Sequence, residues 1–419
     1  MDERPDALNT RVRAATPPLP HHTLWTVQVL RGVAALMVVF GHSQSAVGAV
    51  VASDGQVFVR STFVPWGAGV DLFFVISGFI IVHASGRLFG RAGARRAFVT
   101  RRLIRIVPLY WLVTTLFLAL LAVATLKGGD RFPGLLAILA SYAFLPADTY
   151  GEGRLFPVFD LGWTLNYEML FYALLGLVVA LTRHRALVTL GVMLALLVAV
   201  GRAAPLPAAL WFWTRPIILD FGLGVVIGAL VARRLELPPA LRLAVAVVGI
   251  TVLLADPAHV FDGPVGMTVA NAWPRVLFAG IPVAAVLAAA LLGPEPRMPQ
   301  VAAPFTRVGD ASYSLYLFHP FALIAMEKAA QKLPVVREAP GWLLVLVTVT
   351  AAITLALAVY RWVERPMTHA LTMKFAPRRS DAFSTVEDPS HDEPTPAIPS
   401  PDRKTKRVPA GAGAGSHLS

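Results

Sequence analysis

The apolar stretch LRGVAALMVVFGHS, residues 30–43, carries two ionisable side chains, Arg31 and His42. Eleven residues make close to three helical turns, so both side chains share one helix face, about 16 Å apart. A histidine can accept a proton or an acyl group near neutral pH. Ionisable groups inside an apolar span are costly unless they are paired or used, so this pair predicts chemistry. The structural alternatives are an arginine anchor at the membrane edge and a packing histidine.

A second stretch, GAGVDLFFVISGFII, covers residues 67–81 and carries Asp71 and Ser77. Asp71 stands near the start of an apolar run, where a carboxylate either caps the helix or orients a histidine such as His42. Ser77 lies about two turns further along. We therefore expect Asp71 to assist His42 and Ser77 to line a passage through the membrane.

A third stretch, RRLIRIVPLYWL, holds Arg102 and Arg105 at i, i+3 spacing on one helix face. Guanidinium forks of this kind suit bidentate phosphate binding. The alternative is a pair of topology anchors, because arginines gather on the cytoplasmic side of membrane helices.

A fourth stretch, LGWTLNYEMLFY, contains Trp163 and Glu168. With Trp163 at the membrane interface, Glu168 lies about 8 Å deeper, a level similar to that of His42. A buried carboxylate and an imidazole at one level can pair, and either can accept a proton. The sequence therefore predicts that Glu168 joins His42 in a catalytic group.

A fifth stretch, GDASYSLYLFHP, offers the hydroxyl groups of Ser312 and Tyr313, followed by His319. His319 precedes Pro320, which lacks an N–H and bends helices. We expect these three residues to line a pore or touch the acceptor, with a structural histidine at a kink as the alternative.

The composition indicates which elements position these groups. Of the residues, 56% are hydrophobic and 15% are charged, whereas soluble domains carry about 25% charged residues. The chain has no cysteine, which excludes disulfides and thiolate metal sites. The net charge of +12 falls mostly in loops and tails, where it sets membrane topology rather than indicating nucleic-acid binding. The sequence predicts an all-α polytopic membrane protein with no bound metal or cofactor.

Ten apolar runs approach the length of about 20 residues that a spanning helix needs. They are residues 27–49, 69–86, 106–126, 163–182, 186–201, 213–232, 241–255, 274–293, 313–330 and 342–363. A further run, 134–146, is too short to cross and predicts a re-entrant or half-depth helix buried in protein. The basic loops at residues 86–102, 183–185 and 233–234 then lie on the same side of the membrane as both termini. Since basic loops are usually cytoplasmic, this predicts that both termini are cytoplasmic. Gly224 and Gly228 predict close helix packing.

The chain divides into three expected regions. Residues 1–23 are polar and proline-bearing, which favours a disordered cytoplasmic arm. Residues 24–370 form the membrane domain, whose first span is retained because no small-residue cleavage site follows it. Residues 371–419, rich in Pro, Ser and Gly, predict a disordered cytoplasmic tail.

Taken together and in this order, the five stretches resemble the motifs of acyltransferase family 3, the bacterial integral-membrane O-acyltransferases. The resemblance runs from about residue 24 to 366, and the N-terminal half is most similar to the exopolysaccharide acetyltransferases of that family. One departure is Asn-Tyr before Glu168, where relatives more often have Ser-Val. Many relatives also carry an esterase-like domain after the last span, whereas we expect a disordered tail here.

The resemblance implies a multi-pass protein of the bacterial cytoplasmic membrane that uses acyl-CoA, usually acetyl-CoA, as co-substrate. The acceptor it implies is a hydroxyl on a carbohydrate or glycolipid of the cell envelope. His42 matches the family's essential histidine, Arg31 its arginine partner, Arg102 and Arg105 its RxxR pair, and Glu168 its glutamate. Polysaccharide-synthesis proteins are the expected protein partners.

Two alternatives remain open at this point. A proton-coupled transporter or exporter of a glycan would use His42, Glu168 and His319 as a proton pathway. A non-catalytic scaffold of a polysaccharide-synthesis complex would not need His42 at all. Within the acyltransferase interpretation, His42 acts either as a general base or as a transient acyl acceptor.

Overall fold

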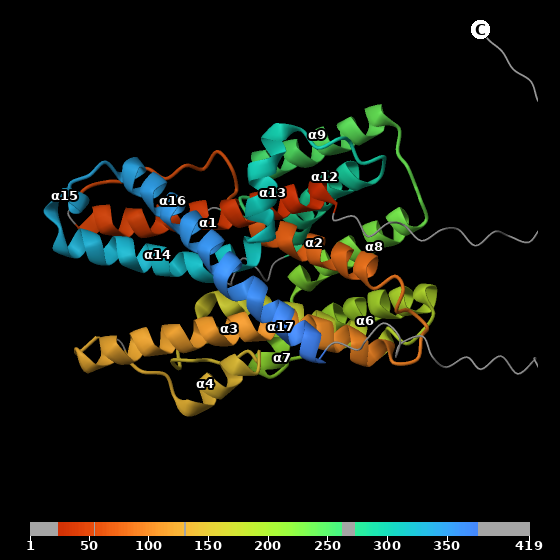
Figure 1. Ribbon diagram of the computed structural model, residues 1–419, viewed down its shortest axis with the longest axis horizontal. Coiled ribbons are helices and arrows are strands. Elements are labelled where there is room, and N and C mark those ends of the chain that lie inside the picture. The colour runs from red at the N-terminus through yellow and green to blue at the C-terminus, as the bar shows by residue number, and fades with distance from the viewer. Residues whose placement is uncertain (1–23, 54, 130, 262–272, 376–419) are drawn as a thin grey trace, which may run out of the picture. The chain divides into compact units, whose positions relative to one another are not determined.

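The computed structural model describes residues 24–53, 55–129, 131–261 and 273–375. Within these ranges the regular structure is entirely helical (Figure 1). The chain splits into two units, residues 1–377 and 378–419. The second unit, the arm 1–23 and most of the expected tail lie outside the described residues.

Ten of the helical segments coincide with the ten expected apolar runs. They are α1 (Trp25–Ser53), α2 (Ala68–Ala84), α3 (Ala94–Leu126), α5 (Trp163–Val178), α6 (Arg183–Ala203), η2 with α8 (Pro216–Ile218, Leu219–Ala232), α9 (Pro239–Ala255), α11 to α12 (Trp273–Leu291), α14 (Ser312–Lys332) and α16 (Gly341–Val359). Short helices between them are α4 (Leu135–Tyr142), η1 (Asp160–Gly162), α7 (Ala208–Trp213), η4 (Gln300–Ala302), α13 (Ala303–Asp310) and α15 (Pro334–Arg337).

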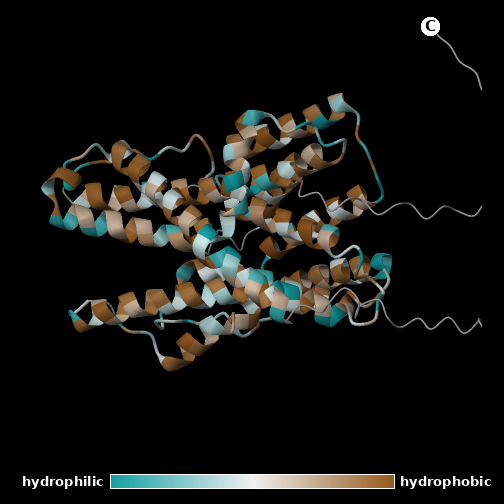
Figure 2. Ribbon diagram, in the orientation of Figure 1, coloured by the Kyte–Doolittle hydropathy of each residue, from teal (hydrophilic) through white to brown (hydrophobic). Residues whose placement is uncertain are grey.

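Five of these helices are long and apolar enough to cross a membrane, and three more are shorter apolar helices. Their outward faces are also apolar: Leu343, Leu346 and Val347 of α16 are exposed, and so are Val188, Val192 and Leu196 of α6. Figure 2 shows hydrophobic colour along most of the helical ribbon. Since such faces would be unfavourable in water, the fold is that of a membrane protein.

The third helix begins twelve residues before the expected run, inside the basic segment that was predicted to be a loop. Its early residues Ala94, Ala97 and Phe98 are buried, whereas arginines occupy the other faces. Apolar residues at i, i+3 and i+4 give an amphipathic helix that packs one face on the protein. The basic segment is therefore largely helical, and Arg102 and Arg105 lie within this long helix.

The last helix also extends past its expected end. A π-helical turn, η5 (Tyr360–Glu364), joins α16 to α17 (Arg365–Phe375), which packs against α3. Residues 371–375, expected to open the disordered tail, are therefore helical.

The short run at 134–146 gives the helix α4, which has 8 residues. Its length of about 12 Å cannot cross an apolar core of about 30 Å. Contrary to the expectation of burial, Leu135, Leu136 and Leu139 are exposed. The helix is attached to α3 by its other end, where Trp111 donates to the Tyr142 carbonyl at 2.9 Å.

Helices α2 and α8 pack closely against each other, and glycines make this contact possible. A Cβ added at Gly224 would collide with the backbone of Val75, and one at Gly78 with the backbone of Phe221. At Gly228 it would come within 2.8 Å of the Val82 side chain. The predicted packing role of Gly224 and Gly228 is confirmed, and this contact fixes α2 beside the functional groups of α1.

Candidate functional site

Two cavities lie between the helices that carry the predicted site residues. The His42 cavity, of about 630 Å³, is lined by His42, Gln44, Arg60, Trp66, Trp163 and Arg275, among others. The arginine cavity, of about 90 Å³, is lined by Arg31, Ser77, Arg102, Arg105, Glu168, Ser312 and Tyr313, among others. Helices α1, α2, α5 and α14 contribute residues to the walls of both cavities.

His42 pairs with His319. The Nδ1 atom of His42 lies 2.9 Å from Nε2 of His319. The two imidazole rings are nearly parallel, with an angle of 20° between their planes. His319 is completely buried, whereas His42 is only half-buried and faces the His42 cavity. His42 is therefore the imidazole that a substrate can reach, and His319 is its support.

The hydrogen bonds of this pair define its tautomers. Nδ1 of His319 lies 3.0 Å from the Leu315 carbonyl, which can only accept, so this nitrogen carries the hydrogen. In a neutral imidazole, Nε2 of His319 is then an acceptor, and His42 must donate to it through Nδ1. Neutral rings are expected because a buried charge without a counter-ion is costly. His42 therefore keeps an unprotonated Nε2, which is the form that a base or nucleophile requires.

The expected partners of His42 lie elsewhere. Both carboxylate oxygens of Asp71 accept from Arg275, each at 2.8 Å, and both side chains are buried. Glu168 lines the arginine cavity rather than the His42 cavity. The hypothesis that Asp71 or Glu168 orients His42 is therefore corrected: the orienting group is His319.

The ion pair between Asp71 and Arg275 forms part of the frame of the His42 cavity. Arg275 also donates to the Gly67 carbonyl at 3.3 Å and lies over the Phe261 ring. Asp220 on α8 is completely buried nearby, at the position that a Cβ on Gly280 would occupy. The ion pair ties α11 to α2, whereas the Asp220 carboxylate makes no hydrogen bond among the described residues.

In the arginine cavity, Arg31 is fixed in place by neutral side chains. Its Nη2 atom donates to Ser312 at 2.8 Å, and its Nη1 atom donates to Gln28 at 2.9 Å. Arg31 is buried at 9% exposure. Ser312, which was expected to line a pore or touch the acceptor, holds Arg31 and lines the same cavity. Arg31 is therefore a fixed positive charge inside the protein and not a free surface anchor.

Arg102 and Arg105 reach the same cavity from α3. Arg102 lies over the rings of Phe98 and Tyr172, 5.6 Å and 5.8 Å from their centres. Its Nε atom is buried without a hydrogen-bond partner among the described residues. Among the described residues the ion pairs join other side chains, so neither guanidinium has a carboxylate within 4.0 Å. Glu168 and Glu364 act on these arginines only at longer range, so Arg102 and Arg105 are left without a paired carboxylate and suit an anionic ligand.

The carboxylate of Glu168 faces these arginines across the cavity. It accepts hydrogen bonds from Ser77, at 3.3 Å, and from the Tyr172 hydroxyl. Tyr313 donates to the Ile106 carbonyl at 2.8 Å, which joins α14 to α3. Ser77, Glu168 and Tyr313 thus lie together in the arginine cavity, and in the part of the chain that the structure describes none of them is hydrogen-bonded to His42.

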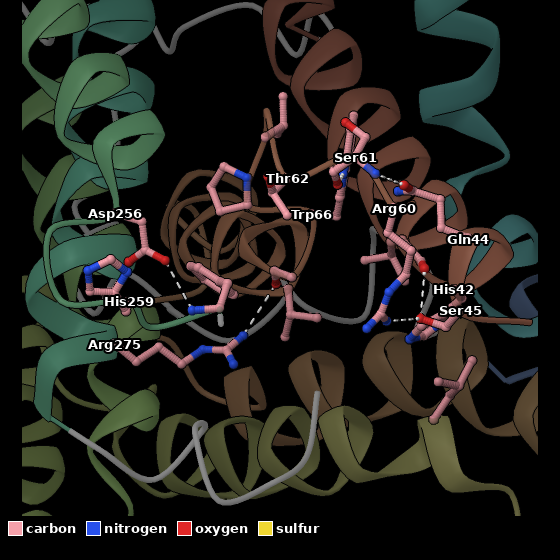
Figure 3. Close-up of a pocket in the computed structure, with 18 of the residues that line it drawn as sticks. His42, Gln44, Ser45, Arg60, Ser61, Thr62, Trp66, Asp256, His259 and Arg275 are labelled. Atoms are coloured by element: carbon pink, nitrogen blue, oxygen red, sulfur yellow. Dashed lines mark hydrogen bonds between the residues drawn. The ribbon is translucent and has the colours of Figure 1, made fainter. Parts of the chain in front are cut away.

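The loop after α1 covers the His42 cavity and is held by polar contacts (Figure 3). Gln44 accepts from the Ser61 N–H at 2.6 Å, Arg60 donates to Ser45 at 3.3 Å, and Trp66 donates to the Ser61 carbonyl at 2.9 Å. Figure 3 shows Arg275 on one side of the cavity and His42 on the other. Aromatic faces beside amide, hydroxyl and guanidinium groups suit a polar ligand with an apolar face.

A second loop reaches this cavity from the segment before α5, through Arg154 and Phe156. Its turn is closed by Asp148, whose carboxylate accepts from the N–H groups of Gly153, Gly151 and Glu152. These backbone hydrogen bonds lower the pKa of Asp148. The Asp148 carboxylate therefore stays ionised near neutral pH and keeps its hydrogen bonds to the turn.

Several residues in or beside the two cavities were not predicted. Arg275, which lines the His42 cavity, and Asp220, which is buried beside it, carried a usable signal, because each is an ionisable residue inside an expected span. Gln44 and Tyr316 carried none, since polar and aromatic residues in membrane helices often only pack. The sequence singled out His319 as a candidate site residue, but it did not predict that His319 contacts His42.

Comparison with known proteins adds independent information. The family model of the acyltransferase domain, acyltransferase family 3, matches residues 25–361. The exopolysaccharide production protein ExoZ of Rhizobium meliloti (strain 1021) is 36% identical over 313 residues, which cover 72% of this chain and 89% of ExoZ. No solved structure is significantly similar to the chain.

Proposed function

Since this chain belongs to acyltransferase family 3, we propose that it transfers an acyl group, by default acetyl, from cytoplasmic acyl-CoA to a carbohydrate hydroxyl. The relative named as an exopolysaccharide production protein favours an exported polysaccharide or its lipid-linked precursor as acceptor. The observation that carries the proposal is His42: it is supported by His319, keeps an unprotonated Nε2 and lines a cavity of about 630 Å³ that has both polar and aromatic walls.

The arginine cavity is proposed to receive the donor. The phosphates of acyl-CoA would meet Arg31, Arg102 and Arg105, which have no salt-bridged carboxylate among the described residues. The pantetheine arm, which is extended and only weakly polar, would then carry the thioester toward His42. About 16 Å separate Arg31 from His42 along α1, a distance that such an arm can span.

The His42 cavity is proposed to receive the acceptor. Nε2 of His42 takes the proton of the sugar hydroxyl while the hydroxyl oxygen attacks the thioester carbonyl carbon. The C–S bond then breaks, and His42 returns the proton to the CoA sulfur. An ester and free CoA result, with no net change in protons. In the second version of the mechanism, Nε2 first attacks the thioester carbonyl carbon, and the C–S bond breaks to release the CoA thiolate. The sugar hydroxyl oxygen then attacks the same carbon, the bond to Nε2 breaks, and the hydroxyl proton goes to the CoA sulfur.

The transporter alternative accounts less well for the geometry. A proton pathway through His42, Glu168 and His319 would need these groups in one chain of contacts. Glu168 instead belongs to the arginine cavity and His42 to the other. Three arginines around a small cavity are also a poor lining for a proton path.

The function is tested with the purified full-length protein in lipid nanodiscs. Acetyl-CoA labelled on the acetyl group is offered with oligosaccharides from the host's surface polysaccharide after alkaline removal of their esters. We expect label to appear on the oligosaccharide as a base-labile ester, with one free CoA thiol released per ester. Movement of oligosaccharide across a proteoliposome membrane with no ester formed and no thiol released would favour the transporter.

The RxxR pair gives a prediction for the donor side. Arg102→Gln and Arg105→Gln should each raise the KM for acetyl-CoA about tenfold, because each removes a charge-assisted contact to a phosphate. The matched control is Arg101→Gln, since Arg101 is exposed on the same helix and lines neither cavity. KM is measured at saturating acceptor. An unchanged KM in both variants, or an equal rise in Arg101→Gln, would mean that the pair serves topology only.

A further inference from the structure

The two cavities meet at a pair of residues that the mechanism above does not use. Among the described residues, Val70 on α2 and Tyr316 on α14 are the two that line both cavities. His42 lies on one side of them, and the three arginines lie on the other. If the donor binds at the arginines and reacts at His42, its thioester must pass between Val70 and Tyr316.

We propose that Val70 and Tyr316 form a gate between the arginine cavity and the His42 cavity, closed in this structure and opened by the pantetheine arm. The purpose of this gate depends on the proposed function. Its geometry is independent of that function and can be tested without it.

Hydrogen bonds hold Tyr316 in the closed position. Its hydroxyl donates to the Leu161 carbonyl at 2.9 Å and lies 2.8 Å from the Thr164 hydroxyl. Leu161 lines the His42 cavity and Thr164 lines the arginine cavity, so the hydroxyl is anchored at their boundary. Because Leu161 lies in η1 and Thr164 lies at the start of α5, the contact ties α14 to this segment across the passage.

Packing completes the barrier. The rings of Phe73 and Tyr316 pack edge to face, with their centres 6.0 Å apart. Tyr316 is 7% exposed, although cavities lie on both sides of it. His319 follows Tyr316 by three residues on the same helix, and the ring centres are 6.3 Å apart. A movement of the Tyr316 ring would therefore take place beside His319, the residue that supports His42.

A barrier at this point has a chemical use. With an open passage, water in the His42 cavity could reach the thioester, and His42 would assist its attack as it assists a sugar hydroxyl. The water oxygen would bond to the carbonyl carbon, the C–S bond would break, and acetate and CoA would result. A gate that opens only for the donor arm limits this loss by keeping water from the thioester.

The absence of cysteine makes the gate directly measurable. Ser77→Cys places a single thiol in the arginine cavity, and Ser45→Cys places one in the His42 cavity. A small, charged methanethiosulfonate reagent is added to the membrane preparation in which Ser45→Cys reacts rapidly. That preparation exposes the His42 cavity, whatever the sidedness of the chain. With the gate intact, we expect Ser77→Cys to react much more slowly than Ser45→Cys.

Gate variants are then combined with Ser77→Cys. Tyr316→Ala should bring its labelling rate close to that of Ser45→Cys. Tyr316→Phe keeps the ring but loses the hydroxyl, and should raise the rate about tenfold, the effect expected for losing a net hydrogen bond or two. Val70→Ala opens the barrier from the other helix and serves if Tyr316→Ala does not fold. Tyr142→Ala is the matched control, because Tyr142 lines neither cavity.

The gate is wrong if Ser77→Cys reacts as fast as Ser45→Cys before any gate substitution. It is equally wrong if folded Tyr316→Ala and Val70→Ala leave the labelling of Ser77→Cys unchanged. Acetyl transfer is measured separately: labelling that responds to the gate without any ester formation would support the gate and remove the proposed function. Ester formation with unresponsive labelling would do the reverse.

Discussion

Replacing His42 with alanine should lower the rate of acetyl transfer by about a thousandfold or more, the range attributed to a positioned acid–base group. The physical reason is that Nδ1 of His42 is bound to His319, which leaves Nε2 unprotonated on a side chain that lines the His42 cavity. The KM for acetyl-CoA should change little, because the arginines that meet its phosphates lie in the other cavity. The measurement is ester formation by purified protein at saturating substrates.

The matched control is His184→Ala, since His184 is exposed and lines neither cavity. It should leave the rate unchanged. Both variants must elute as the wild type does on size exclusion and keep its thermal stability. A folded His42→Ala protein that still forms ester at the wild-type rate would exclude His42 from the chemistry.

The same pair of proteins separates the two versions of the mechanism. Acetyl-CoA labelled on the acetyl group is added without acceptor, and the protein is denatured and digested at neutral pH. If His42 takes the acyl group itself, label should remain on the peptide that contains residue 42 and be absent from His42→Ala. If His42 acts only as a base, neither protein should carry label. Each outcome assigns one role to Nε2.

The elements of this fold could be predicted from the sequence because lipid imposes a simple constraint. A span needs an unbroken apolar run, and each of the ten runs is helical in the structure. The ends were harder to predict: α3 begins twelve residues early because Arg95, Arg96 and Arg101 are exposed on a helix whose other face is buried. An average over a hydropathy window cannot register that alternation.

The pairing of site residues could be predicted only along one helix. Arg31 and His42 share a face because the helical period fixes it. The depth argument placed Glu168 level with His42, but depth is a single coordinate and says nothing about direction around the bundle. Glu168 faces the other cavity, and the imidazole beside His42 comes from a position 277 residues later in the chain. Asp71 likewise pairs with Arg275, which lies 204 residues further along the chain.

A count of the charged residues inside the expected spans could have predicted part of this pairing. Asp71 and Asp220 are both carboxylates inside expected spans, and Arg275 is the guanidinium that lies among them. Since buried ions need counter-ions, counting the charges within spans predicts that some such cluster exists. It does not predict which helices meet there, because that depends on the glycine contacts between α2 and α8.

The supporting histidine gives the second large expected effect, and two amide variants resolve its role. In His319→Gln the amide oxygen can lie near the former position of Nε2 and accept from Nδ1 of His42, so most of the activity should remain. In His319→Asn the shorter side chain can reach the Leu315 carbonyl, as Nδ1 does now, but not His42. His319→Asn should therefore lower kcat about a hundredfold, the effect typical of losing an orienting partner.

This contrast distinguishes a positioning residue from a packing residue. If His319 only filled space next to Pro320, the two amides should act in order of the volume they remove and should reduce thermal stability together with activity. If it fixes the tautomer of His42, kcat should follow the ability to accept a hydrogen bond from Nδ1, while the KM for acetyl-CoA stays constant in both variants. Equal activity of folded His319→Gln and His319→Asn would leave the tautomer argument without support. A restored kcat in the glutamine variant alone would show that the proton on Nδ1 of His42 must be held for Nε2 to react.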